Sequence, residues 1–247
     1  MAQTGLRASR FAWASEVSGS PPAYRIAHLL TSAILHLLFN IEISGRANVP
    51  PDRPYIAIAN HLNWLDSFAL LIALPRHQHV HVLAWSKVME SSKLAWLIEA
   101  TKVGFISAER DPVRRSRERR KLHRELLECL AGGNPLVIFP EGQIGCTEGG
   151  VAALMPGFAR LSLSSGAPVL PVGLSGSREL WLRKRIHINI GSPISPERVT
   201  APALVDRSRE AVCELIPEYR DPGGVKLFRR RLTRLIPSLT NWYESDL

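Results

Sequence analysis

The chain has 247 residues, of which 45% are hydrophobic and 21% are charged, values that are typical of a globular protein with a substantial core. Its net charge of +9 and its pI near 10.0 favour an anionic partner, such as a membrane surface, a nucleic acid or a phosphate-bearing substrate. The cysteines, Cys129, Cys146 and Cys213, have no metal-ligand spacing and are odd in number. This pattern indicates a reducing compartment and excludes a zinc site and a structural disulfide.

The N-terminal region divides into two parts. Residues 1–21 lack the continuous apolar stretch of a signal peptide, and we expect them to form a disordered tail. The apolar run Ile26–Ile41 is broken by polar residues and is shorter than the roughly 20 residues that span a bilayer. We therefore expect residues 22–43 to provide a helix that docks on the protein or associates with a membrane surface.

Hydrophobic periodicity predicts helices that alternate with strands. The expected helices are Tyr24–Asn40, Asp66–Leu74, Lys87–Ala100, Val113–Leu130 and Phe158–Ser164. The expected strands are Ile41–Ile43, Tyr55–Ala59, His79–Leu83, Val103–Ile106, Leu136–Phe139, Pro168–Val172 and Ile186–Ile190. This alternation predicts an α/β fold with a mixed, largely parallel central sheet that is flanked by helices.

Two stretches combine basic residues with helical spacing. Val225–Trp242 has apolar residues at helical spacing with lysine and arginines between them, which predicts a C-terminal amphipathic helix. This helix either lies on a membrane surface or packs against the core. The basic run Arg114–Arg124 is either a solvated helix face or a patch for anionic lipid or an acidic acyl carrier protein.

His61 and Asp66 lie where a predicted strand meets a predicted helix. Within one continuous helix, two residues five positions apart would be rotated by about 140° and would not meet. At a strand-to-helix junction, the Asp66 carboxylate could instead hold one ring nitrogen of His61 and leave the other nitrogen available to take a proton. The alternative is that Asp66 caps the helix and His61 is a polar turn residue.

A second candidate motif is Phe139–Gly142, which follows a predicted strand and enters a glycine-rich segment. Backbone N–H groups in such a loop can approach an anion or a developing oxyanion. The Glu141 carboxylate could bond substrate hydroxyls or orient a cationic side chain. The alternative is an ordinary turn at the end of a strand.

Four segments in order resemble the sequence blocks of the glycerolipid (lysophospholipid) acyltransferase family, of the 1-acyl-glycerol-3-phosphate acyltransferase type. The first segment resembles the His-x4-Asp block. Together the four segments span more than half of the chain. The segments are Asn60–Asp66, Gly104–Arg110, Phe139–Gly142 and Ala167–Val172.

The resemblance implies a single acyltransferase core over residues 44–195 and a helical extension over residues 196–247. It implies that His61 is the general base and Asp66 its partner. Substrate-binding roles are implied for Asn60, Arg110, Glu141 and Gly142, with Arg110 contacting a phosphate or a similar anion. Neither a cofactor nor a metal is implied.

The resemblance also implies the reaction. A fatty acyl group would pass from acyl-CoA or acyl carrier protein to a lysolipid hydroxyl, most directly converting 1-acyl-glycerol-3-phosphate to phosphatidic acid. We expect peripheral attachment to an anionic membrane surface on the cytoplasmic face. The family commonly continues with Thr-Arg-Ser after the third block, whereas this chain has Gln143–Gly145. Another acceptor, such as lyso-ornithine lipid or a glycolipid, is therefore an alternative.

Two other classes of protein stay open. Gly173–Ser177 begins like the nucleophile elbow of a serine hydrolase or thioesterase but lacks its last glycine. A non-catalytic acyl-binding protein is a further alternative, against which the pairing of His61 with Asp66 argues. The sequence has no zinc-finger spacing and no RNP-like aromatic motif, so we do not expect a nucleic acid partner despite the positive charge.

Overall fold

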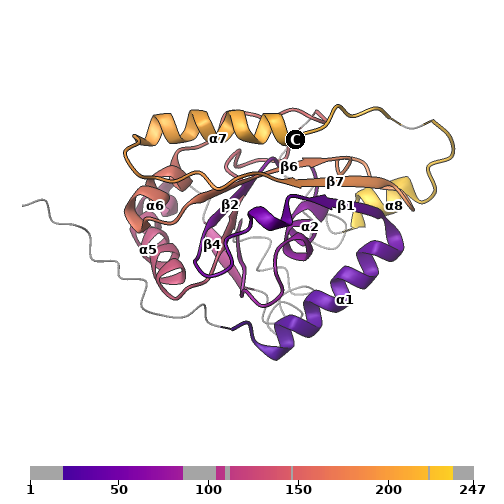
Figure 1. The fold of residues 1–247 in the computed structure, drawn as a ribbon. Coiled ribbons are helices and arrows are strands. Elements are labelled where there is room, and N and C mark those ends of the chain that lie inside the picture. Colours follow the sequence, from indigo (N-terminus) through magenta and orange to yellow (C-terminus); the bar gives the residue numbers. More distant parts are fainter. Residues whose placement is uncertain (1–18, 86–103, 109–111, 146, 222, 236–247) are drawn as a thin grey trace, which may run out of the picture.

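The computed structural model describes residues 19–85, 104–108, 112–145, 147–221 and 223–235 (Figure 1). Its strands are β1 (Asn40–Ser44), β2 (Ile56–Ala59), β3 (His81–Trp85), β4 (Gly104–Ala108), β5 (Leu136–Ile138), β6 (Val169–Ser175) and β7 (Arg185–Ile190). Its α-helices are α1 (Pro22–Leu38), α2 (Leu65–Ala73), α5 (Pro112–Ala131), α6 (Gly157–Ser165), α7 (Ala201–Leu215) and α8 (Arg229–Thr233). A 3-10 turn covers Arg46–Asn48.

The described strands form one seven-stranded sheet in the order β1-β7-β6-β2-β5-β3-β4. Neighbouring strands are parallel everywhere except between β6 and β7, which are antiparallel. The prediction of a mixed, largely parallel sheet flanked by helices is therefore confirmed.

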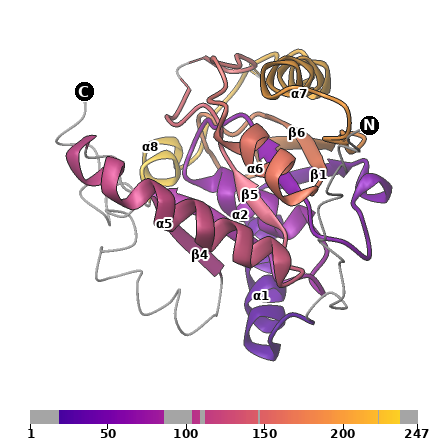
Figure 2. The same cartoon turned by 90° about the vertical axis from the view of Figure 1, so that its left-hand side faces the viewer.

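The central strands are apolar on both faces, as expected for parallel strands with helices on each side. Ile56 and Ile58 of β2 pack in one core cluster with residues of α5, α6 and α7, whereas Ala57 and Ala59 pack with α2. Figure 2 shows α5, α6 and α7 together on one side of the sheet. Leu126 and Leu130 of α5 lie in the first of these clusters.

The chain before α1 is held against the core. Gly19 forms a β-bridge with Gln78, and the Ser20 amide donates to the carbonyl oxygen of His77. The Ser20 hydroxyl donates to the Arg76 carbonyl oxygen, and its side chain is buried. The predicted disordered tail over residues 1–21 is therefore too long at its C-terminal end, because these polar contacts fix the last residues. Residues 1–18 lie outside the described residues.

The C-terminal segment departs from the predicted amphipathic helix. Residues 225–228 are not helical, and Phe228 has a left-handed backbone with φ of 59°, so α8 begins only at Arg229. A left-handed residue cannot continue a right-handed helix, which explains the error. The predicted helix Lys87–Ala100 and residues 236–242 lie outside the described residues. No helix in the described part of the chain is long and apolar enough to cross a membrane.

Candidate active site

The carboxyl end of β2 carries the first candidate motif. The Asn60 side chain is fully buried and pairs with the backbone of Leu174 in β6: its Nδ2 donates to the carbonyl oxygen at 2.9 Å, and its Oδ1 accepts from the amide at 2.8 Å. Both polar ends of the side chain are thus used inside the protein. Asn60 fixes the start of the loop that carries His61, a different role from the substrate contact predicted from the sequence.

His61 and Asp66 meet in the manner that the strand-to-helix junction predicted. The Nδ1 atom of His61 lies 2.9 Å from Oδ2 of Asp66. The His61 side chain is 15% exposed, whereas that of Asp66 is completely buried. A buried carboxylate against Nδ1 holds the proton on that nitrogen, so the Nε2 lone pair is available to accept a proton.

The backbone around Asp66 stabilises the ionised carboxylate. Its Oδ2 also accepts hydrogen bonds from the amides of Leu62 and Asn63, the latter at 2.7 Å. Asp66 stands in the first turn of α2, where the helix dipole favours a negative charge. The chain therefore supplies N–H donors and the dipole to a carboxylate that would otherwise be costly to bury.

Glu141 joins the two candidate motifs. Its Oε1 accepts from the His61 amide and its Oε2 from the Ala152 amide, each at 3.2 Å. Burial raises the pKa of the Glu141 carboxyl, while these two N–H donors oppose the shift. Glu141 thus holds the backbone of the loop that carries His61 next to the glycine-rich segment.

Two further contacts to His61 were not predicted from the sequence. The ring of Phe139 stacks on the imidazole at 4.1 Å between centroids, with 21° between the planes. The Gly145 amide donates to the His61 carbonyl oxygen at 2.6 Å. Phe139 is the first residue of the Phe139–Gly142 motif, and its place directly before Pro140–Glu141 is the signal that could have identified this contact. No local pattern marks the Gly145 contact.

The remaining predicted site residues differ in what the structure says of them. Gly142 lies beside the site with φ of 68°, and a Cβ there would come within 2.3 Å of the Met155 methyl group. Arg110 lies outside the described residues. The hydroxyl group of Ser175, in the segment resembling a nucleophile elbow, is buried and has no hydrogen-bond partner among the described residues, so it is not joined to a histidine.

The C-terminal segment reaches the loop that carries His61. The indole N–H of Trp64, three residues after His61, donates to the carbonyl oxygen of Leu232 in α8 at 3.1 Å. The Thr233 hydroxyl oxygen accepts from the Leu180 amide at 2.9 Å and lies 3.2 Å from the Leu180 carbonyl oxygen. Leu232 also packs in the apolar cluster between α1 and α2. One side of the site therefore depends on a segment that is remote in sequence.

A partly exposed histidine held by a buried aspartate at the carboxyl end of parallel strands is an arrangement suited to general base catalysis. Comparisons with known proteins give the class. The family model described as Acyltransferase matches residues 40–175, more than half of the chain. The chain therefore belongs to the acyltransferase family and is an O-acyltransferase.

The relatives include the 1-acyl-sn-glycerol-3-phosphate acyltransferase alpha of Ovis aries, which is 24% identical over 79% of this chain and 70% of its own length. The lyso-ornithine lipid O-acyltransferase of Pseudomonas aeruginosa is 32% identical over 58% of this chain and half of its own length. Among solved structures, the 1-acyl-sn-glycerophosphate (LPA) acyltransferase of Thermotoga maritima has the same fold. It aligns with a TM-score of 0.63 and 20% identity over 80% of this chain and 81% of its own chain.

Proposed function

We propose that this protein transfers a fatty acyl group from a thioester donor, acyl-CoA or acyl carrier protein, to the hydroxyl of a lysolipid, with 1-acyl-glycerol-3-phosphate as the acceptor. The hydrogen bond between His61 and Asp66 carries the proposal, because it prepares a base for a hydroxyl group. The names of the relatives support a lysolipid acceptor.

The reaction needs one proton carrier. Nε2 of His61 takes the proton of the acceptor hydroxyl while the hydroxyl oxygen attacks the thioester carbonyl carbon. Asp66 balances the positive charge on the imidazolium. The tetrahedral intermediate then collapses with cleavage of the C–S bond, and the leaving thiolate receives the proton from Nε2. The ester and the thiol are the products, and His61 returns to its neutral form.

Glu141 and Phe139 act as positioning residues in this scheme. Glu141 fixes the His61 backbone, and Phe139 fixes the plane of the imidazole. A base whose ring cannot turn spends more of its time aimed at the hydroxyl, which lowers the entropic part of the barrier. The Met155 methyl group lies where a Cβ of residue 142 would stand, so only glycine fits at this position. We propose that Gly142 contacts the acceptor through its backbone. Arg110 is the proposed ligand of the acceptor phosphate.

A lyso-ornithine lipid is the second candidate acceptor. A relative with that acceptor in its name shares 32% identity with this chain. Within the described part of the chain, no lysine or arginine side chain bonds to His61, Asp66 or Glu141. The two candidate acceptors differ in their head groups, so a comparison of the activity with each acceptor distinguishes them.

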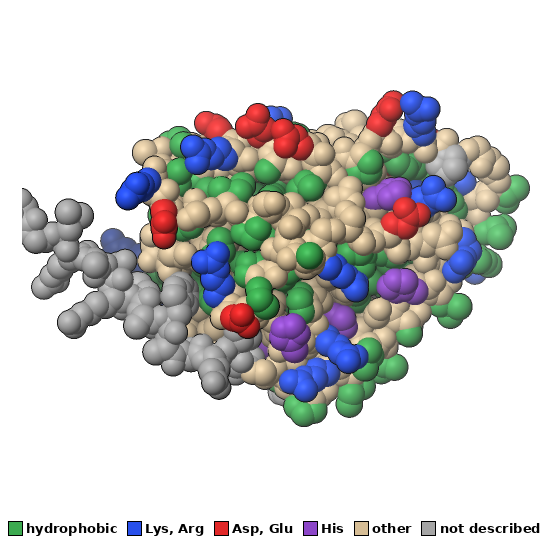
Figure 3. Space-filling view, viewed as in Figure 1, with side chains coloured by type: hydrophobic (Ala, Val, Ile, Leu, Met, Phe, Trp, Pro, Cys, Tyr) green, Lys and Arg blue, Asp and Glu red, His purple; other side chains and the backbone are tan. Residues whose placement is uncertain are grey.

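We propose that α1 attaches the protein peripherally to the cytoplasmic face of a membrane. Its outer face exposes apolar side chains at helical spacing, namely Ile26, Leu29, Leu30, Ile34 and Leu37. Figure 3 shows hydrophobic side chains along the edge formed by α1. Water is a poor environment for such a stripe, whereas the acyl region of a bilayer surface is a favourable one.

Thiol release from a long-chain acyl-CoA by the purified protein tests the function. The assay uses a panel that includes 1-acyl-glycerol-3-phosphate and lyso-ornithine lipid. We expect acceptor-dependent release that falls by at least about 10² in His61→Ala, the usual contribution of a general base. A matched control, His187→Ala, removes a partly exposed histidine on β7 and should stay active. A folded, fully active His61→Ala protein would contradict the mechanism, and release without any acceptor would indicate a thioesterase.

A further inference from the structure

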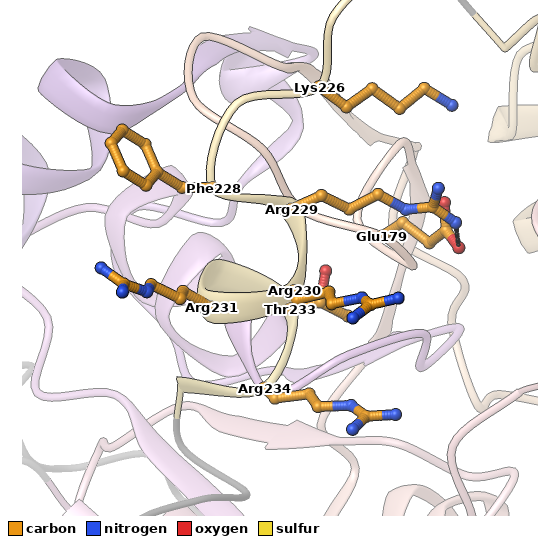
Figure 4. Close-up of a pocket in the computed structure, with 8 residues that line it drawn as sticks. All are labelled: Glu179, Lys226, Phe228, Arg229, Arg230, Arg231, Thr233 and Arg234. Carbon is orange, nitrogen blue, oxygen red and sulfur yellow. Dashed lines mark hydrogen bonds and ion pairs between the residues drawn. The ribbon is translucent and has the colours of Figure 1, made fainter.

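A pocket of about 640 Å³ lies at the C-terminal segment, outside the catalytic dyad (Figure 4). Its wall is strongly cationic. The lining residues are Glu179, Lys226, Phe228, Arg229, Arg230, Arg231, Thr233 and Arg234. Five of these are lysine or arginine and one is acidic, so a ligand of opposite charge is favoured.

Only part of this positive charge is neutralised within the protein. Arg229 pairs with Glu179, and Lys226 pairs with Asp221. The guanidinium groups of Arg230 and Arg234 make no ion pair with any residue that the structure describes. In Figure 4 these two side chains extend to the same side as Lys226 and Arg229, whereas Arg231 and Phe228 extend to the opposite side. Unpaired cations that share one side of a pocket are suited to a group with more than one negative charge.

Exposed apolar residues accompany the cationic ones in the same segment. Val225, Leu227 and Phe228 are exposed, and so is Leu37 near the end of α1. Backbone hydrogen bonds join these parts: the Leu182 amide donates to Leu227, and the next amide, that of Arg183, donates to the last residue of α1, Leu38. Cationic and exposed apolar side chains therefore occur together on one short segment, a combination that matches a lipid, which has a charged head and apolar chains.

We propose that this pocket binds the phosphomonoester headgroup of a membrane lipid, as found in phosphatidic acid. Arginine forms bidentate hydrogen bonds with phosphate oxygens. A phosphomonoester carries close to two negative charges at neutral pH, whereas a phosphodiester carries one. The pocket should therefore prefer a phosphomonoester lipid over a phosphodiester lipid at equal surface charge.

This inference rests on the proposed function in one respect, which is attachment to a membrane. If the acceptor is 1-acyl-glycerol-3-phosphate, both the acceptor and the product carry the preferred headgroup. Product accumulating in the bilayer would then strengthen the attachment of the enzyme.

Vesicle co-sedimentation of the full chain tests the inference. One set of phosphatidylcholine vesicles contains phosphatidic acid, and a second contains phosphatidylglycerol at matched surface charge. We expect at least tenfold tighter binding to the first set. Replacing Arg230 and Arg234 by glutamine should weaken binding to phosphatidic acid vesicles by roughly thirtyfold and abolish the preference. Arg160→Gln with Arg207→Gln, two exposed arginines on α6 and α7, is the matched control and should keep the preference.

Catalysis and binding can fail separately in this test. His61→Ala should bind vesicles like the unchanged protein, so a wrong mechanism would not alter the binding result. Circular dichroism verifies that the double arginine variant is folded. Equal binding to the two vesicle sets, or an unchanged preference in the folded Arg230→Gln/Arg234→Gln protein, would overturn the inference.

Discussion

Glu141 accepts a hydrogen bond from the backbone amide of His61, although 80 residues separate the two in the sequence. The bond joins two of the four segments on which the resemblance to acyltransferases rests. The sheet accounts for this contact: β2 and β5 are neighbours, so a carboxylate three residues after the end of β5 reaches the loop that follows β2.

The Glu141 carboxylate should matter to catalysis through the position of His61. In Glu141→Gln, one oxygen can still accept an N–H bond, but the amide nitrogen would face the second N–H donor, either that of His61 or that of Ala152. We expect kcat to fall by about tenfold or more, since small displacements of a catalytic group are costly. Steady-state kinetics measure this loss. Glu128→Gln on the exposed face of α5 is the control, and full activity of folded Glu141→Gln would exclude the positioning role.

Asp66 should contribute to both activity and stability. Asp66→Asn keeps the shape but removes the charge that balances the imidazolium and that strengthens the bonds from Leu62 and Asn63. We expect a loss of at least about 10² in kcat and a decrease of about 1–2 kcal/mol in the free energy of unfolding. Denaturant titration and thiol-release kinetics measure the two effects. Asp206→Asn, an exposed change on α7, should alter neither, and a stable, active Asp66→Asn protein would contradict the assignment.

The apolar face of α1 should control attachment to membranes. Leu30→Asp with Ile34→Asp replaces two exposed apolar side chains, so we expect vesicle binding to weaken by roughly 10² or more. The thermal midpoint should change little, because neither side chain is in the core. Leu163→Asp changes an exposed leucine on α6, on the other side of the sheet, and serves as the control. Unchanged binding in the double variant would show that α1 does not contact the bilayer.

Stability should fall in mild acid because of two partly buried histidines, His28 in α1 and His81 in β3. Burial lowers the pKa of both His28 and His81 from 6.5, and the neighbouring His79 contributes for His81. Between the folded and unfolded pKa values the unfolded chain binds more protons, so stability is complete above pH 6.5 and is lost as the pH falls below it. Thermal midpoints at about pH 7.5 and about pH 5.5 measure the loss. The thermal midpoint of His28→Gln should decrease less between these two pH values than that of the unchanged protein. An equal decrease would exclude a contribution of His28 to the loss of stability in acid.

Much of the fold could be predicted from the sequence because its strands are short, apolar and bounded by clear breaks. Ile56–Ala59 and Leu136–Ile138 fall inside the predicted strands. The site dyad was predictable for a related reason, since a strand before His61 and a helix after Asp66 define their separation. Contacts that depend on two remote segments, such as Asn60 with Leu174, leave no local pattern.

The errors also have physical causes. The apolar spacing from Val225 onwards suggested one helix, but periodicity does not reveal a left-handed residue such as Phe228. The residues before α1 were polar and small, which is typical of a disordered tail, yet the Ser20 hydroxyl is satisfied by the Arg76 carbonyl oxygen. Composition indicates how much apolar surface a segment can bury, but it does not predict hydrogen bonds to residues that are remote in the sequence.

The hydrogen bond from Trp64 to Leu232 has a consequence for the order in which the enzyme matures. A chain is synthesised from its N-terminus, and 168 residues separate the donor from its acceptor. The loop that carries His61 and Trp64 is therefore synthesised early, whereas Leu232, which accepts the Trp64 hydrogen bond, is synthesised 168 residues later. During that interval the apolar residues that Leu232 later covers are open to solvent, a condition that favours aggregation. The contact between Trp64 and Leu232 is thus completed late in synthesis, although His61 stands in the first quarter of the chain.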